Sequence, residues 1–245
     1  MSRLIINGYC GNVGLIGRLL RIKYFYQPDL GFRVAKVRNE GIKLAAYENI
    51  LLLDSGMIAS EDLLSIHLNI HSKQTEHAVI GMSYGVNEFD NANTDKLLHI
   101  LSNESKEELF TELSRRPELN DCRYDYLASQ QFDISSSTAP WSVFWTGHVS
   151  FKKSSFNSIG GFDEWFCSWG GEDVDLGIRL YKRGCNFYLI DTIEAIHHPH
   201  YKDSRDKELS SQKNIEYICN KFKCTEVDLL RKYSWIEILI STSLY

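Results

Sequence analysis

The stretch Trp169-Gly170-Gly171-Glu172-Asp173-Val174-Asp175 brings an aromatic ring, two glycines and three carboxylates together within seven residues. A helix is predicted over 173–183, and acidic side chains stabilise the N-terminus of a helix. Glycine lets the backbone approach another group closely, and tryptophan offers a flat apolar surface. The pattern is typical of a carboxylate that acts as a general base beside a ring-shaped substrate. It is equally typical of an acidic helix start beside a packed tryptophan, and this stretch alone leaves both interpretations open.

Length and composition limit the class of protein. The chain has 245 residues, of which 43% are hydrophobic, and this suits one large α/β domain with a sizeable core. A net charge of −5 does not suggest a nucleic-acid partner. The six cysteines form no CxxC pair and are expected to be reduced thiols. Because no apolar run approaches the roughly 20 residues that span a bilayer, and no signal-peptide pattern is seen, we expect a cytoplasmic protein, with attachment at a membrane periphery left open.

Apolar strands alternate with helices along the chain. We expect strands at 4–6, 22–26, 49–53, 77–84, 142–151 and 186–190, and helices at 33–47 (broken near Gly41), from 60, 91–116, 173–183 and from 207 onward. This alternation predicts a mixed, mostly parallel central sheet flanked by helices. We expect a single domain over 1–245, with a core over 1–205 and a helical C-terminal extension over 206–245. Residues 49–53 are predicted to form a buried central strand that delivers Asp54 to the ligand-binding edge of the sheet.

The first residues carry a separate signal. A strand candidate leads into Gly8, Gly11, Gly14 and Gly17, which resembles the phosphate loop of short-chain dehydrogenases and epimerases. No Tyr-x-x-x-Lys pair follows, and the chemistry of that family needs one. A dehydrogenase or epimerase is therefore only a third hypothesis, and a flexible glycine-rich start is the simpler interpretation.

Four blocks in a fixed order carry a stronger resemblance. They are Gly31-Phe32-Arg33 through Ile42, Ile50 to Gly56, Phe156 to Asp163 with Trp169 to Leu180, and Ala195 to His200. Together they resemble family-2 glycosyltransferases of the GT-A fold. The C-terminal half is similar to the galactosyltransferase-type region of chondroitin polymerases and polypeptide N-acetylgalactosaminyltransferases. The resemblance covers roughly residues 20 to 205.

The resemblance implies a metal site. Asp54 stands where the Asp-x-Asp motif of the family begins, and His197 matches its late metal ligand, with His200 as a second candidate. A hard Mn²⁺ or Mg²⁺ ion prefers carboxylate and phosphate oxygens, and it would neutralise charge on a departing diphosphate. The family usually has a second carboxylate where this chain has Gly56, so binding of the cation is expected to be weakened.

The resemblance also implies roles for the opening stretch. Asp173 matches the catalytic base that takes the proton of the acceptor hydroxyl, and Glu172 would hydrogen-bond a sugar. Trp169 would stack on a sugar face, beside Gly170 and Gly171. Arg33 and Arg38 are candidates for contacts with the diphosphate or the nucleoside.

The front of the chain departs from the family. Members usually begin with a strand–helix–strand unit that holds the nucleotide, but only about 30 residues precede Gly31 here, and they do not match. We therefore expect an abbreviated N-terminal nucleotide-binding part, or a truncated or divergent form.

Simpler interpretations accompany the remaining candidates. Asp54 could cap a loop, and the histidines at 197–200 could lie in a surface turn or, less readily, hold zinc. Trp141, Phe144 and Trp145 could line an acceptor groove or pack in the core. Asp175 and Arg179 have the spacing of a helix-surface pair. His67, His71, His77 and His148 are expected to be solvated or packed.

The sequence therefore predicts an inverting glycosyltransferase with Asp173 as general base. Its partners would be a nucleotide-sugar donor and a carbohydrate, peptide or small-molecule acceptor, and homo-oligomerisation is left open. The alternative is a degenerate transferase that only binds sugar or protein. Gly56 and the abbreviated front favour this alternative, whereas the intact Trp169 to Asp175 stretch disfavours it.

Overall fold

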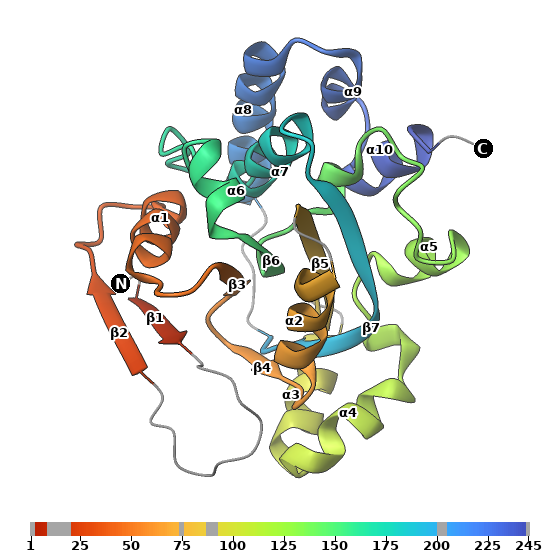
Figure 1. Cartoon of the computed structure of the whole chain (residues 1–245). Helices are drawn as coiled ribbons and strands as arrows, with labels where there is room; N and C mark the ends of the chain where they lie inside the picture. Colours follow the sequence, from red (N-terminus) through yellow and green to blue (C-terminus); the bar gives the residue numbers. More distant parts are fainter. Residues whose placement is uncertain (1–2, 9–20, 74–75, 87–92, 200–204, 244–245) are drawn as a thin grey trace.

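The structure, a computed structural model, describes residues 3–8, 21–73, 76–86, 93–199 and 205–243. Its centre is a five-stranded sheet in the order β3 (Asn49–Leu53), β6 (His148–Lys152), β5 (His77–Tyr84), β7 (Asn186–His197) and β4 (Met57–Ala59) (Figure 1). Strands β5 and β7 are parallel, and the other three pairings are antiparallel. An α/β architecture is confirmed, but the prediction of a mostly parallel sheet is wrong.

The error has a structural cause. The expected pattern treated each strand–helix–strand segment as a crossover between parallel neighbours. Instead β6 inserts antiparallel between β3 and β5, and β4 follows β3 after a three-residue turn to pair with the far end of β7. Strand β3 therefore lies at one edge of the sheet, and most of its residues are only partly buried, so its prediction as a buried central strand is also wrong.

A separate two-stranded sheet precedes the main one. Strand β1 (Arg3–Gly8) pairs antiparallel with β2 (Arg21–Tyr26), beside helix α1 (Val34–Leu44) (Figure 1). Both strands match the expected apolar segments. The glycine run from Gly11 to Gly17 lies outside the described residues. Helix α1 continues through Gly41, whose carbonyl accepts a hydrogen bond from Ala45 N–H at 3.1 Å, so the expected break does not occur.

Helices surround the main sheet. The described α-helices that follow α1 are α2 (Leu63–Lys73), α3 (Thr94–Asn103), α4 (Lys106–Ser114), α5 (Tyr124–Ser129), α6 (Lys153–Ser158), α7 (Glu172–Lys182), α8 (Arg205–Phe222), α9 (Thr225–Asp228) and α10 (Trp235–Ser241). Short 3-10 helices η1 (Pro117–Leu119), η2 (Pro140–Val143) and η3 (Leu229–Arg231) complete the set. None of the described helices is both long and apolar enough to cross a membrane.

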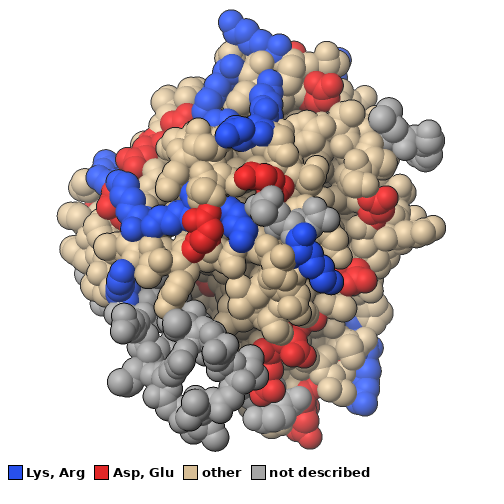
Figure 2. Space-filling model, viewed as in Figure 1, with Lys and Arg blue, Asp and Glu red and all other residues tan. Residues whose placement is uncertain are grey.

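One hydrophobic core joins the sheet to the C-terminal helices. Phe144, Phe151 and Phe187 pack there with Leu176 of α7, and Ile218 of α8 belongs to the same cluster. The expected strand over 142–151 is correct only in its second half, because Pro140 starts a 3-10 turn that buries Trp141 and Phe144. Basic and acidic side chains are interspersed over the face in Figure 2.

Candidate active site

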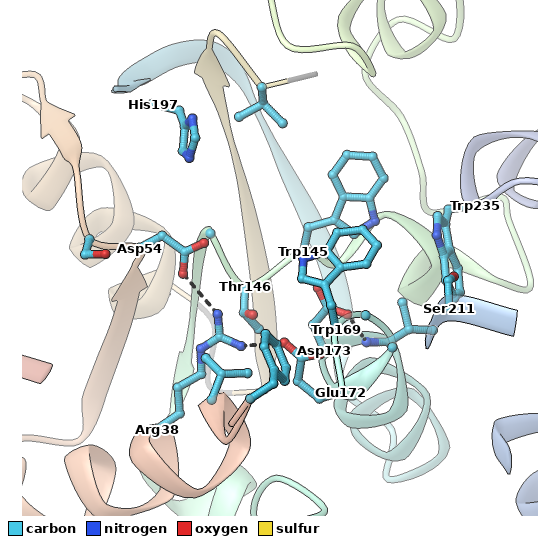
Figure 3. A pocket seen from close by; sticks show the side chains of 18 of the residues that line it. Arg38, Asp54, Trp145, Thr146, Trp169, Glu172, Asp173, His197, Ser211 and Trp235 are labelled. Carbon is cyan, nitrogen blue, oxygen red and sulfur yellow. Dashed lines mark hydrogen bonds and ion pairs between the residues drawn. The ribbon is translucent and has the colours of Figure 1, made fainter. Parts of the chain in front are cut away.

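A cavity of about 430 Å³ opens where several parts of the fold meet. They include helix α1, the start of α7, the turn between β3 and β4, the end of β7, and helices α8 and α10 (Figure 3). Its lining residues are Phe32, Val34, Arg38, Asp54, Ser55, Met57, Val86, Trp145, Thr146, Gly147, Trp169, Gly170, Gly171, Glu172, Asp173, Val174, His197, Ser211 and Trp235.

The two glycines shape the start of α7. Gly170 and Gly171 have φ angles of 91° and 93°, a left-handed conformation that favours glycine. A Cβ atom on Gly171 would lie 3.1 Å from the Ile218 side chain, so α8 packs directly against the backbone here. Glu172 and Asp173 therefore fall in the first turn of α7, where the helix dipole favours negative charge.

Asn214 of α8 holds this glycine loop in place. Its side-chain amide nitrogen donates to the carbonyls of Ser168, Trp169 and Gly170 at 3.3, 3.1 and 2.6 Å, and its oxygen accepts from Ser168 Oγ at 3.1 Å. Asn214 is buried, so these bonds also satisfy its own polar atoms. Sequence reasoning missed this residue because its partners lie more than 40 positions away and no local motif marks it.

Arg38 links two carboxylates across the site. Its guanidinium donates to Glu172 Oε1 at 2.9 Å and to Asp54 Oδ1 at 3.0 Å (Figure 3). Burial alone would lower the pKa of Arg38, but the neighbouring charges of Asp54, Glu172 and Asp173 together raise it. Glu172 is buried and its Oε2 has no hydrogen-bond partner among the described residues, whereas 47% of the Asp54 side chain is exposed. Arg38 thus fixes Glu172 and leaves Asp54 accessible to a ligand.

Asp173 is held differently from its neighbour. It receives backbone hydrogen bonds from Val174, at 2.8 Å, and Thr146, and its side chain keeps some surface toward the cavity. Burial, followed by repulsion from Glu172, raises the pKa of Asp173 to about 7, although Arg38 opposes the shift. A carboxylate with such a pKa can accept a proton near neutral pH and release it again.

Backbone pairing brings Asp54 and His197 to the same side of the cavity. The Asp54 N–H donates to the carbonyl of Gly147 at 3.1 Å, and Met57 pairs with His197 in the β4–β7 ladder. Gly56 lies in the turn between Asp54 and Met57 and has a φ of 93°. Its carbonyl accepts a hydrogen bond from the His198 N–H at 3.0 Å. The glycine that replaces the expected second carboxylate is therefore required by the turn itself.

The structure places most of the predicted site residues around this one cavity. Arg33 is the exception: it precedes α1, and only its neighbours Phe32 and Val34 line the cavity. His200 lies outside the described residues. Sequence reasoning assigned no role to Thr146, Ser211 or Trp235, which also line the cavity.

One further expectation changes, and another is narrowed to one of its alternatives. Asp175 and Arg179 are paired at 2.8 Å, but Asp175 is completely buried and also accepts from Lys221 at 2.5 Å, so the pair is internal rather than on the helix surface. Of the two states expected for His67, His71, His77 and His148, solvated or packed, the structure shows the packed one.

Comparison with known proteins shows a similarity to glycosyltransferases. Residues 127–202 match the family described as the N-terminal domain of galactosyltransferase. The chain is 34% identical over 218 residues to validoxylamine A glucosyltransferase from Streptomyces hygroscopicus subsp. jinggangensis, which covers 88% of this chain and 50% of that protein. Over most of its length the chain is therefore similar to family-2-like glycosyltransferases.

Other glycosyltransferase relatives are larger. Chondroitin synthase from Pasteurella multocida is 27% identical over 82% of this chain and 22% of its own length. Hyaluronan synthase from the same species is 29% identical over 90% of this chain and 24% of its own length. The chain thus spans half of the glucosyltransferase relative and about a quarter of the two synthases.

The side chains around the cavity supply only part of a metal site. No group of three or more His, Cys, Asp or Glu side chains in the described part of the chain has an arrangement that could hold an ion. Asp54 and His197 both line the cavity, but Asp54 is already bonded to Arg38. These two side chains fit a divalent cation only if another molecule supplies the remaining ligands.

Proposed function

We propose that this protein transfers a sugar from a nucleoside diphosphate donor to an acceptor hydroxyl, with inversion at the anomeric carbon, on a GT-A type of fold. The single observation that carries the proposal is Asp173, a half-buried carboxylate with a pKa raised to about 7 that faces a cavity in a glycosyltransferase homologue. The similarity to glycosyltransferases supports sugar transfer in general, and the geometry supports the choice of base.

In this mechanism Asp173 accepts the proton of the acceptor hydroxyl. The acceptor oxygen then forms a bond to the anomeric carbon of the donor while the bond from that carbon to the diphosphate oxygen breaks. The electron pair of the broken bond leaves with the diphosphate. Asp173 becomes neutral, which its buried position beside Glu172 favours. Holding the acceptor oxygen and the donor carbon in line would supply much of the acceleration.

The donor diphosphate would lie on the opposite side of the cavity, near Arg38, Asp54 and His197. We propose that Asp54 and His197 hold a Mn²⁺ or Mg²⁺ ion only when diphosphate oxygens complete its ligand set. Such an ion would neutralise charge that develops on the leaving diphosphate. Arg38 keeps the carboxylate of Glu172 in place and offers its own positive charge to the same region.

A binding module without catalysis is the second candidate. The bond between Arg38 and Asp54 favours it, because it occupies one oxygen of the carboxylate that a cation would need. The two candidates make opposite predictions for turnover but similar predictions for nucleotide binding.

A screen of nucleotide sugars tests the proposal. The protein is incubated with uridine, guanosine, thymidine and adenosine diphosphate sugars, with and without Mn²⁺, and release of nucleoside diphosphate is measured. The proposal expects release from at least one donor, and Asp173→Asn should lower it by about 10²–10⁴-fold. Nucleotide-induced thermal stabilisation without any turnover would instead support the binding module.

The metal proposal needs a variant that the backbone tolerates. Gly56→Asp would restore the family's second acid, but the left-handed φ of Gly56 makes any side chain there strained. Ser55→Asp adds a carboxylate at a lining position without that conflict. We expect Ser55→Asp to lower the Mn²⁺ concentration needed for half-maximal nucleotide binding, with Ser55→Asn as the uncharged control. An identical Mn²⁺ response in both variants would contradict the placement of a cation at Asp54.

A further inference from the structure

The cavity has two chemically different sides. Arg38, Asp54 and His197 form the charged side (Figure 3). Trp145, Trp169 and Trp235 form the other, with Asp173 facing the space between them (Figure 3). All three indoles are partly exposed, so each presents surface to the cavity. We refer to these three tryptophans as the aromatic wall.

Trp145 is fixed in its orientation. The Arg123 guanidinium lies 4.6 Å from the centre of its ring, and the indole N–H donates to the Ser142 carbonyl at 3.2 Å. Arg123 is itself buried and bonded to Asp121 at 2.7 Å. Because these contacts hold the ring in place, a ligand meets a preformed surface and does not have to order it.

Trp235 enters the wall from the C-terminal end of the chain. It is the first residue of α10, whose start is fixed by a capping box in which Ser234 N–H donates to Glu237 Oε2 at 2.8 Å. Ile238 and Leu239 bury the next turn of the helix in the core. The position of Trp235 therefore depends on packing of α10 and not on a loose tail.

Helix α10 is also tied to the segment that precedes Trp145. Thr138 N–H donates to the Thr242 carbonyl at 3.0 Å, and the hydroxyls of Ser137 and Thr242 are 2.8 Å apart. These bonds fix α10 against the chain that leads into η2, and η2 in turn leads to Trp145. Two indoles from distant parts of the sequence are thus held by one connected structure.

A wall of indoles beside one carboxylate has a specific chemical preference. A pyranose ring has a face of C–H groups that packs on aromatic rings, while its hydroxyls remain available for hydrogen bonds. A nucleoside diphosphate carries negative charge and suits the side with Arg38. Ser211 of α8 lies close to Gly170 at the aromatic side and adds a hydroxyl there.

We propose that the aromatic wall is the acceptor subsite, and that Trp235 binds the apolar face of a saccharide ring whose hydroxyl faces Asp173. The proposal rests on the proposed function and narrows the acceptor from carbohydrate, peptide or small molecule to a saccharide. Ser211 and Trp235 lie beyond the family match at 127–202, so helices α8 and α10 supply a part of the acceptor site outside that region.

The experiment separates the two sides of the cavity. Intrinsic tryptophan fluorescence is titrated with methyl β-glucoside, cellobiose, maltose and N-acetylglucosamine, and thermal stabilisation is measured with nucleoside diphosphates plus Mn²⁺. Trp235→Leu removes the indole and Trp235→Phe keeps an aromatic ring. Trp165→Leu is the matched control, because Trp165 is an exposed tryptophan that stacks on Tyr217 at 3.6 Å and does not line the cavity.

We expect at least one saccharide to bind the wild type and the Trp165→Leu variant with equal affinity. Trp235→Leu should weaken that binding by about tenfold or more, and Trp235→Phe should restore part of it. Nucleoside diphosphate stabilisation should be the same in all variants, which also shows that each is folded. When an active donor is known, the KM for the acceptor should rise in Trp235→Leu while the KM for the donor does not change.

Three results would overturn the proposal: no saccharide binds the wild type, saccharide affinity is unchanged in Trp235→Leu, or the variant loses nucleoside diphosphate binding instead. Failure of the proposed function looks different. In that case no nucleotide sugar is turned over, yet saccharide binding still depends on Trp235, and the cavity is a saccharide-binding site without transferase activity.

Discussion

Two adjacent carboxylates acquire different properties from their surroundings. Glu172 receives the buried guanidinium of Arg38, whereas Asp173 receives only backbone N–H groups. The pKa of Asp173 is therefore raised to about 7 by burial and by the charge of Glu172. The sequence placed both acids at a helix start, and only the family resemblance gave them different roles. The contact with Arg38 that separates them could not be predicted, because Arg38 lies 134 residues from Glu172.

The raised pKa of Asp173 predicts the pH dependence of the reaction. A general base must be ionised, so kcat/KM should rise with pH through about 7 and then level off. Stability should show the opposite trend, because a carboxyl whose folded pKa exceeds its unfolded value contributes stability at low pH that is lost as the pH rises through about 7. The dependence of kcat/KM on pH in the wild type checks the first statement. Urea unfolding of the wild type and of Asp173→Asn between about pH 5 and pH 9 checks the second.

Asp173→Asn should remove the loss of stability that accompanies a rise in pH from about 5 to about 7, and most of the activity. A rate that is already level below about pH 6 would show that the base has an ordinary carboxyl pKa or is another residue.

The buried ion pair of Arg38 and Glu172 predicts that substitutions of these two residues have non-additive effects on the free energy of unfolding. Arg38→Met leaves the buried Glu172 carboxylate without its cation, and breaking such a pair costs about 3–5 kcal/mol. The double variant Arg38→Met with Glu172→Gln removes both charges and should recover a large part of that loss. Asp54→Asn should cost much less, because the Asp54 side chain is half exposed. Equal losses in the single and double variants, measured by denaturant unfolding, would show that Arg38 acts through packing alone.

At the scale of elements, strand β6 and helix α2 meet through buried histidines. His67 Nδ1 and His71 Nε2 each lie 2.7 Å from Ser150 Oγ, and His67 Nε2 lies 3.0 Å from His148 Nε2. Burial lowers the pKa of His67 to about 3, and that of His71 and His148 to about 4. The charged groups that act on these rings are Lys152 and His77 at His71, and Arg123, Asp121 and Glu194 at His148.

This cluster predicts that the protein loses stability in mild acid. Because the folded pKa values are depressed, the neutral histidines stabilise the fold above about pH 6.5, and that stability is lost as the pH falls toward about 4. Each histidine contributes up to about 1.4 kcal/mol per pH unit in that range. His67→Phe should reduce the slope of the unfolding free energy against pH by the amount that corresponds to about one proton. His99→Gln, on the exposed side of α3, should leave that slope unchanged. Both slopes are obtained by measuring the free energy of unfolding of the two variants at several pH values. Equal slopes in His67→Phe and His99→Gln would contradict the role of the buried histidines in the acid sensitivity.

Local patterns predicted elements better than their pairing. Strand β5 matches its expected range, and α7 begins within one residue of the prediction, because both depend on near-neighbour periodicity. The edge position of β3 and the antiparallel insertion of β6 depend on contacts between distant segments, and no local pattern specifies them. Asp54 still reaches the cavity, because its backbone N–H donates to the carbonyl of Gly147, which directly precedes β6.

At the scale of the whole molecule, the site depends on the C-terminal helices. Asn214 of α8 holds the glycine loop, and Trp235 of α10 lines the cavity. The sequence predicted a core over 1–205 with a helical extension. However, the extension places six nearly inaccessible apolar side chains, Ile218, Cys219, Val227, Leu230, Ile238 and Leu239, in the same core as the sheet.

This packing predicts that the extension cannot be removed. Burial of those side chains contributes on the order of 10 kcal/mol, which is comparable to the total stability of an ordinary domain. A chain that ends at residue 204 should therefore lack a cooperative unfolding transition and should not bind nucleotide. Within the full chain, Ile238→Ala should cost about 2–5 kcal/mol, whereas Ile240→Ala, at an exposed position of the same helix, should cost less than about 1 kcal/mol. If the shortened chain instead unfolds cooperatively and still binds nucleoside diphosphate, helices α8 to α10 form a separate layer. Loss of saccharide binding in that fragment would then isolate the contribution of these helices to the acceptor side of the cavity.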